Sequence, residues 1–142
     1  SNGGLELRVR YTSAGEGPVN HAEMTQGDEF TAVITVANHS ATGNFSNLAL
    51  TYLIPSGWEI INDRLTGTEE NDGRYDRLDI RDDRVLLYFD LPMNTYKKFR
   101  IRLRAAYEGD YILPSASCEC MYDRSVNACT ASERCKVTRL GK

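Results

Sequence analysis

Residues 99–107 alternate strictly between two kinds of side chain, and this pattern limits the fold more than any other feature of the sequence. Phenylalanine, isoleucine and leucine occupy every second position from 99 to 103, and three arginines alternate with them. A period of two residues places the apolar side chains on one face of a strand and the arginines on the other. Shorter segments of the same kind recur along the chain, with turns about every 8 to 12 residues and almost no helical periodicity. The sequence therefore predicts an all-β fold, an antiparallel immunoglobulin-like sandwich of about 7–9 strands.

The expected strands are short and are separated by polar or glycine- and proline-containing turns. They cover residues 5–11, 30–37, 48–54, 58–61, 85–89, 99–107, 111–113, 116–122 and 136–140. Trp58 is expected to close one end of the core, and the acidic segment 66–73 is expected to be a mobile loop. A length of 142 residues predicts one domain, 1–142, that buries about two thirds of its unfolded surface. Residues 1–4 are expected to be a tag scar and linker that begin a fragment of a longer protein.

The charge balance excludes one class of partner. A net charge of −3 and a pI of about 5.4 give no basic footprint for nucleic acid. No apolar run approaches the roughly 18 residues that a membrane-spanning helix needs, and no signal peptide is recognised. We therefore expect no nucleic-acid partner and no membrane span.

The chain is poor in the groups that catalysis needs. Its two histidines, His21 and His39, stand outside any H-x-x-H or H-E-x-x-H pattern, and no G-x-S-x-G elbow occurs. The aspartates near residue 80 lack the D-x-[DN]-x-[DN]-G order of a calcium loop and are interleaved with arginines that would repel a cation. We expect no catalytic residue, no metal site and no cofactor, and we interpret the chain as non-enzymatic.

The segment 75–90 joins a dense charge cluster to an apolar run that is typical of a buried strand. The cluster includes Asp79, Arg81, Asp82, Asp83 and Arg84. Alternating aspartate and arginine side chains can pair with one another and with backbone donors, and we expect them to fix a crossover between two sheets. The alternative interpretation is a charged corner that is simply solvated.

Four cysteines fall in the last quarter of the chain, at Cys118, Cys120, Cys129 and Cys135. Their spacing does not match a zinc knuckle or ribbon. An even number in a compact region favours disulfides and an oxidising compartment, and four separate reduced thiols are the alternative. Spacing alone does not assign the pairing, although Cys118 and Cys120 share one face of a strand and are not expected to bond each other.

Several segments together resemble the last macroglobulin-like domain of bacterial alpha-2-macroglobulins. The matching segments are residues 50–60, 79–85, 88–91, 104–109 and 113–123, which contain a Pro-Ser-Gly-Trp-Glu turn, an Asp-Ile-Arg-Asp-Asp-Arg stretch and a Met-Tyr-Asp segment. The resemblance is collinear and covers nearly the whole chain. The Arg-Ala-Ala-Tyr-Glu-Gly stretch at 104–109 is similar to that of Bacteroidetes proteins.

This resemblance implies a function that belongs to a larger molecule. The parent would be a periplasmic, lipid-anchored protease trap of which this chain is the non-catalytic C-terminal module, and the anchor would be its only link to a membrane. The implied partners are the thioester domain, the neighbouring macroglobulin-like domains and, through the parent, the target proteases. A thioester needs a cysteine followed three residues later by glutamine. The single glutamine, Gln26, lies upstream of every cysteine, so that bond would lie elsewhere in the parent.

Met121 and Tyr122 are similar to the segment that covers the thioester in this family. An aromatic ring and a flexible thioether make a close-fitting cover that keeps water from a labile bond. The alternative interpretation is that one of the two fills the core of the penultimate strand. A different function class also stays open, an immunoglobulin-like binding module of a surface adhesin or glycan-binding protein. An apolar patch around Met121 and Tyr122 favours the first function, and an exposed Trp58 in an aromatic groove favours the second.

Overall fold

The computed structural model describes residues 4–13, 15, 17–40, 43–61 and 77–140, and it is all-β throughout this part. The expected loop at 66–73 lies outside these residues. The strands are β1 (Leu5–Thr12), β2 (Glu23–Thr25), β3 (Glu29–Asn38), β4 (Phe45–Leu53), β5 (Trp58–Ile61), β6 (Arg77–Ile80), β7 (Arg84–Leu91), β8 (Tyr96–Ala105), β9 (Gly109–Leu113), β10 (Ser117–Cys120), β11 (Asp123–Cys129) and β12 (Glu133–Thr138). The fold class is confirmed. The expected count of about 7–9 strands is too low, because the described residues contain 12 strands, several of them only three or four residues long.

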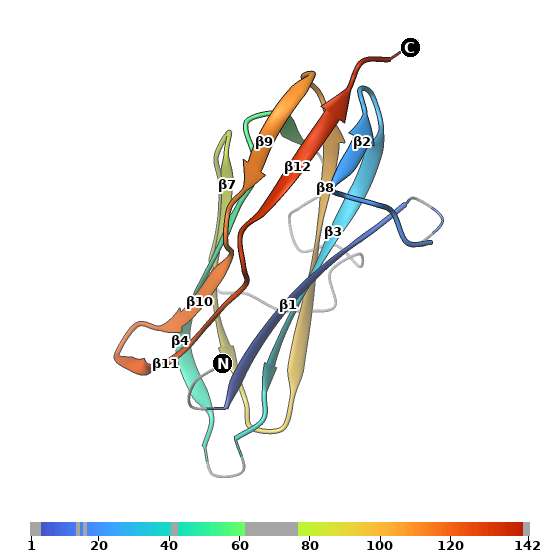
Figure 1. Ribbon diagram of the computed structural model, residues 1–142. Coiled ribbons are helices and arrows are strands. Elements are labelled where there is room, and N and C mark those ends of the chain that lie inside the picture. The colour runs from blue at the N-terminus through green and yellow to red at the C-terminus, as the bar shows by residue number, and fades with distance from the viewer. Residues whose placement is uncertain (1–3, 14, 16, 41–42, 62–76, 141–142) are drawn as a thin grey trace.

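Two sheets face each other in a sandwich, and a third, smaller sheet continues it at one end (Figure 1). The first sheet has the order β1-β3-β8-β5, the second β11-β10-β4-β7-β6, and the third β2-β12-β9. All strand pairs are antiparallel except β12 with β2, which runs parallel. The N-terminus, the β7–β8 turn and the β10–β11 hairpin lie at the opposite end of the sandwich from the C-terminus (Figure 1).

The core lies between the first two sheets, where the period of two places it. Phe99, Ile101 and Leu103 of β8 are at most 1% exposed, whereas the arginines between them are only partly buried. Trp58 is 3% exposed and packs edge-on against Phe30, with 4.8 Å between the ring centroids. The tryptophan therefore belongs to the core, as the sequence predicts.

The charged segment at 79–84 does not cross between sheets. Its residues end β6, form a turn and begin β7, and β6 and β7 are antiparallel neighbours in one sheet. The turn is closed by the Arg81 amide, which donates to the Arg84 carbonyl at 2.9 Å. The expected crossover was wrong because ion pairs between close sequence neighbours are equally compatible with a tight hairpin. None of the described residues forms a helix long and apolar enough to cross a membrane.

Candidate functional site

The candidate site is the two-residue turn between β10 and β11, formed by Met121 and Tyr122. β10 ends at Cys120, whose Cα lies opposite that of Asp123, so the chain reverses over these two residues alone. The strand predicted to run to residue 122 therefore ends two residues early. Met121 is 49% exposed and Tyr122 is 81% exposed. The interpretation that one of them fills the core is wrong, because both side chains point to solvent.

The turn rests on an irregularity in β4. The Met121 amide donates to the Asn47 carbonyl at 3.0 Å, and the Cys120 thiol donates to the Ser46 carbonyl at 3.2 Å. The register of β4 against β7 shifts between Phe45 and Leu48, so residues 46 and 47 are free to accept these bonds. The turn is thereby attached to a central strand of its sheet.

Asn47 is itself held in an uncommon conformation. Its φ of 58° lies in the left-handed region, which asparagine tolerates better than most residues. Its amide donates to Asp90 Oδ1 of β7 at 2.9 Å. The support under the turn thus involves three strands, β10, β4 and β7, and it fixes where Met121 and Tyr122 project.

The far side of the turn is closed by local bonds. Asp123 Oδ1 accepts from the Ser125 amide at 3.1 Å and from the Ser125 hydroxyl at 2.6 Å, and these bonds lower the pKa of the Asp123 carboxyl. Asn127 Nδ2 donates to the Arg124 carbonyl at 2.7 Å. The register between β10 and β11 shifts after Glu119, which leaves three extra residues on β11. The hairpin therefore twists sharply beside its exposed tip.

This arrangement fits contact with another surface better than it fits catalysis. The tip offers a flexible thioether and an aromatic ring, which are groups that pack against apolar surface. A large aromatic ring on a fixed backbone buries apolar area at little cost in conformational entropy. Among the described residues, no three His, Cys, Asp or Glu side chains form a group that could hold a metal ion.

The four cysteines are free thiols in the structure, so the expected disulfides are not formed. Cys118, Cys120 and Cys135 are buried, and Cys129 is exposed. Each faces a residue other than cysteine across its sheet: Ala128 and Leu50 lie opposite Cys118, Asp123 and Leu48 opposite Cys120, Ser117 opposite Cys129, and Tyr111 opposite Cys135. Burial raises the pKa of Cys118 to about 12 and that of Cys135 to about 11. The buried thiols act as small apolar side chains, which is the alternative that the sequence left open.

The charged turn at 79–84 pairs with itself. Arg81 contacts Asp79 at 3.1 Å and Arg84 contacts Asp83 at 3.0 Å, and both pairs are exposed. The bond from Arg84 lowers the pKa of Asp83. The expected pairing among these side chains is present, while Asp82 lies exposed at the tip of the turn. The turn supplies no residue to the Met121–Tyr122 site, since the two hairpins lie at opposite ends of the sandwich (Figure 1).

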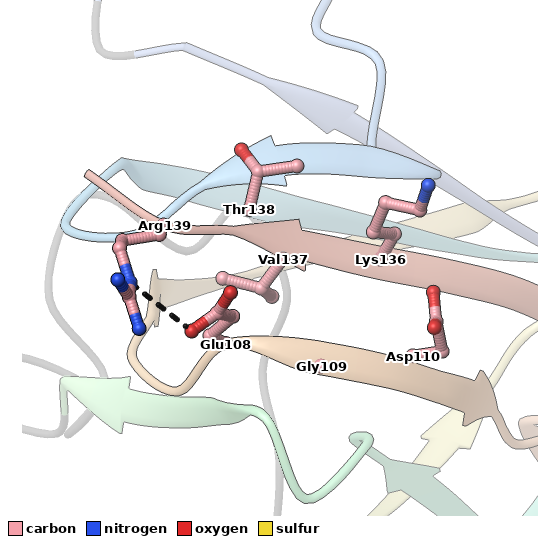
Figure 2. Close-up of a pocket in the computed structure, with 7 residues that line it drawn as sticks. All are labelled: Glu108, Gly109, Asp110, Lys136, Val137, Thr138 and Arg139. Carbon is pink, nitrogen blue, oxygen red and sulfur yellow. Dashed lines mark ion pairs between the residues drawn. The ribbon is translucent and has the colours of Figure 1, made fainter. Parts of the chain in front are cut away.

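A shallow groove of about 580 Å³ lies along β9 and β12 at the C-terminal end. Figure 2 shows an ion pair between Arg139 and Glu108 across its rim, at 3.5 Å. Asp110 and Lys136 stand opposite each other on the two strands. Charges of opposite sign therefore alternate in the groove, and it presents no single-sign site for a charged ligand.

A second groove, of about 490 Å³, opens between the edge strands β5 and β6, and Tyr107 and Trp58 contribute to its lining. The Trp58 ring offers little surface there, because it is 3% exposed and packs against Tyr11 and Phe30. The exposed tryptophan that would favour an adhesin or glycan-binding module is therefore not found.

Sequence reasoning selected the two residues at the tip but missed their support. Ser46, Asn47 and Asp90 gave no recognisable signal, because they lie far from residue 121 in sequence. An asparagine next to a predicted strand start is a weak sign of a left-handed residue, and it becomes informative only once the bulge in β4 is known.

Comparison with known proteins decides the family. The protein-family model for the bacterial alpha-2-macroglobulin MG10 domain matches residues 4–124 of this chain. The chain belongs to this family. It is 30% identical over 133 residues to the alpha-2-macroglobulin of Pasteurella multocida strain Pm70. The aligned region covers 92% of this chain and 7% of that protein. The MG10 chain thus spans less than a tenth of the length of this curated relative.

Solved structures of alpha-2-macroglobulins share the MG10 fold with this chain. The Salmonella protein reacted with methylamine superposes with a TM-score of 0.84 at 20% identity, over 97% of this chain and 9% of that chain. The trypsin-activated protein from Escherichia coli superposes with a TM-score of 0.83 at 18% identity, over 97% of this chain and 10% of that chain. At these identities the superpositions establish the fold.

Proposed function

We propose that this MG10 domain is the non-catalytic, C-terminal module of a protease-trapping alpha-2-macroglobulin, and that its Met121–Tyr122 turn packs against the thioester domain of the parent. The observation that carries the proposal is the exposure of both side chains, 49% and 81%, on a turn that three strands support. An exposed apolar pair on a well-supported backbone gains free energy when a partner covers it.

Such a cover would protect a thioester by keeping water and amines away from it. The bond hydrolyses or reacts with amines unless water and amines are kept away, and a phenol ring with a thioether beside it fills a small apolar opening. The chain itself contains no cysteine followed three residues later by glutamine. The tip would therefore act on a bond in another part of the parent.

The relatives supply the context of the proposal. The Salmonella relative is described as reacted with methylamine, and the Escherichia coli relative as trypsin-activated. We propose the same pattern for the parent of this chain: cleavage by a target protease followed by capture. We further propose that the parent is a periplasmic protein held to the inner membrane by its own lipid anchor.

The first experiment mixes the full-length parent with trypsin and resolves the products on a denaturing gel. A protease-linked band of high mass that methylamine pretreatment removes is expected. Cleavage without a linked band would mean capture by enclosure and would remove the shielding role. Absence of both discrete cleavage and inhibition would overturn the assignment to a protease trap.

The role of the tip is tested by Tyr122→Ala in that parent. We expect methylamine to release the thioester thiol about tenfold or more faster, because one ring of the apolar cover is gone. The measurement is the rate of thiol release followed with a chromogenic disulfide. Tyr107→Ala is the matched control, since Tyr107 is 59% exposed and follows β8 at the other end of the sandwich. Equal rates for the two variants would eliminate the shielding role.

A further inference from the structure

The outward side of the β1-β3-β8-β5 sheet carries a surface that the proposed function does not use. Six basic residues from two of its strands lie on this side and form what we call the basic face: Arg8, Arg10, Lys98, Arg100, Arg102 and Arg104. They fall in cross-strand rows, because Arg8 and Lys98 both lie opposite Thr35, and Arg10 and Arg100 both lie opposite Val33. Neighbouring strands are about 4.8 Å apart, so these rows form a flat array.

Val33 shows how the arginines lie. It is on the outward side of β3, yet it is only 3% exposed. The residues opposite it on the two neighbouring strands are Arg10 and Arg100, and arginine stems at such positions commonly lie over apolar surface. Stems laid along the sheet leave the guanidinium groups at the surface with less freedom than extended side chains have.

The charge on this face contrasts with the rest of the chain. The six basic residues are drawn from 17 in a chain that also carries 20 acidic ones. Three carboxylates share the face, and all three stand near its ends. Glu6 pairs with Arg8 at 2.6 Å, and Glu59 and Glu29 pair with Arg104 at 2.5 and 3.1 Å. Glu29 also pairs with Arg102 at 3.4 Å. The two pairs with Arg104 raise its pKa, mainly through Glu59.

Two basic residues near the middle of the face keep a positive charge that no described carboxylate pairs with. Within the described residues, Arg10 and Lys98 lie in no ion pair, and the Lys98 ammonium stands 5.9 Å from the centre of the Tyr96 ring. Arg10 is exposed, and Lys98 is partly so. A flat array of this kind, with arginines in the majority, suits carboxylates, because a guanidinium binds a carboxylate through two parallel hydrogen bonds.

We propose that the basic face docks an acidic protein surface, supplied by another domain of the parent chain. The relative that matches this chain is more than ten times longer, so the parent offers many domain surfaces. The docking is independent of the Met121–Tyr122 turn, which lies on the other large sheet. Complementary charge fixes the orientation of the two domains and chooses between partners more than it adds affinity.

The test titrates the 142-residue chain with a fluorescein-labelled peptide of twelve glutamates at low salt and follows fluorescence anisotropy. We expect saturable binding that weakens steeply as salt rises. The double variant R10Q/K98Q should weaken it by about three- to tenfold, because two exposed charge contacts are lost. The matched control is R134Q/K136Q on β12, which removes the same charges from another sheet and should leave the affinity within about twofold of the original. Trp58 fluorescence reports that each variant is folded.

Other occupants predict different outcomes. Equal losses in the two double variants would mean general charge attraction and would overturn the proposal. Tighter binding to vesicles containing phosphatidylglycerol, or to a single-stranded oligonucleotide, would replace the acidic protein with a lipid or nucleic acid. The sequence also holds acidic residues at 69, 70 and 72. Peptide binding that occurs only after these three are neutralised would show that the chain itself occupies the face, which would also overturn the proposal.

Discussion

The turns of the two hairpins at the edges of the five-stranded sheet are held in place by different kinds of interaction. The β6–β7 hairpin closes one edge and the β10–β11 hairpin closes the other. The side chains of the β6–β7 turn form ion pairs between residues one or two positions apart, and one backbone bond, from the Ile54 amide to the Asp83 carbonyl at 3.0 Å, ties the turn to the end of β4. The β10–β11 turn is held by β4, through bonds to Ser46 and Asn47, more than 70 positions away.

This difference shows where an interaction site is to be sought. Exposed ion pairs between close sequence neighbours satisfy each other and contribute little to stability. The charged groups of such a turn already have partners, so the turn gains little from contact with another surface. The β10–β11 tip has a backbone that is bonded to β4 through the Met121 amide, and its two side chains have no partner within the described residues. Such a tip can bind another surface without first losing its own order.

The largest expected effect concerns the thiols around the β10–β11 hairpin. Cys129 should react with a chromogenic disulfide at pH 8 orders of magnitude faster than Cys118, whose pKa of about 12 leaves about one thiolate in ten thousand. Cys120 should also be slow, because it is buried and donates to Ser46. We expect one fast thiol in the folded chain and four after unfolding without reductant. Cys129→Ser is the control and should have no fast thiol.

Fewer than four thiols after unfolding would reveal a disulfide. The β10–β11 hairpin would then be covalently stapled, and the comparison of the two edges would have to be redrawn.

A smaller effect is expected from the support beneath the tip. Asn47→Val should lower the free energy of unfolding by about 1–2 kcal/mol, because a β-branched residue is strained at a φ of 58°. Asn47→Gly is the matched control and should be close to neutral, since glycine adopts this conformation freely. Thermal unfolding followed by circular dichroism measures both variants. If the two lower the midpoint equally, the side chain of Asn47 matters and its backbone conformation does not.

The smallest effect is expected at the β6–β7 turn. The double variant D83N/R84Q should leave the unfolding temperature at pH 7 and physiological salt unchanged within error, because the pair is exposed. The Arg84 contact lowers the pKa of Asp83, so any stability it contributes is present above the unfolded pKa of about 3.9 and is lost as pH falls through the lower folded value. Unfolding temperatures at pH 7 and pH 2.5 test this. A clear loss at pH 7 would show that the Asp83–Arg84 ion pair contributes to stability.

Sequence reasoning succeeded where a single face of a strand is buried. Residues 5–11 and 99–105 alternate clearly, and both are strands with the predicted faces inward, although the strand predicted to run to residue 107 ends at Ala105. β11 was missed, because its residues 123–129 are mostly polar and its exposed edge position demands no apolar alternation. β2 was missed as well, since three residues are too few to show any period.

The candidate site could be predicted only in part. The resemblance pointed to Met121 and Tyr122, but a period of two would have turned one of them inward. What reverses the chain after Cys120 is the pairing of β10 with the bulged end of β4, which is a contact between distant segments. The predicted crossover at residues 79–84 was wrong for a related reason, because the ion pairs in this segment are local and specify no partner strand.

The parallel pairing of β12 with β2 has a consequence for the order of assembly. β2 near residue 24 finds its hydrogen-bonding partner only at residues 136–138, so the smallest sheet depends on the widest sequence separation of any strand pair in the described chain. During synthesis at about 5–20 residues per second, β2 and β9 must wait on the ribosome for β12 to emerge. Met24, which is buried when the sheet is complete, stays exposed until then. The third sheet is therefore complete only when β12 has been synthesised. A pause in translation just before β12 would leave β2 and β9 with unpaired edges that other chains could bind.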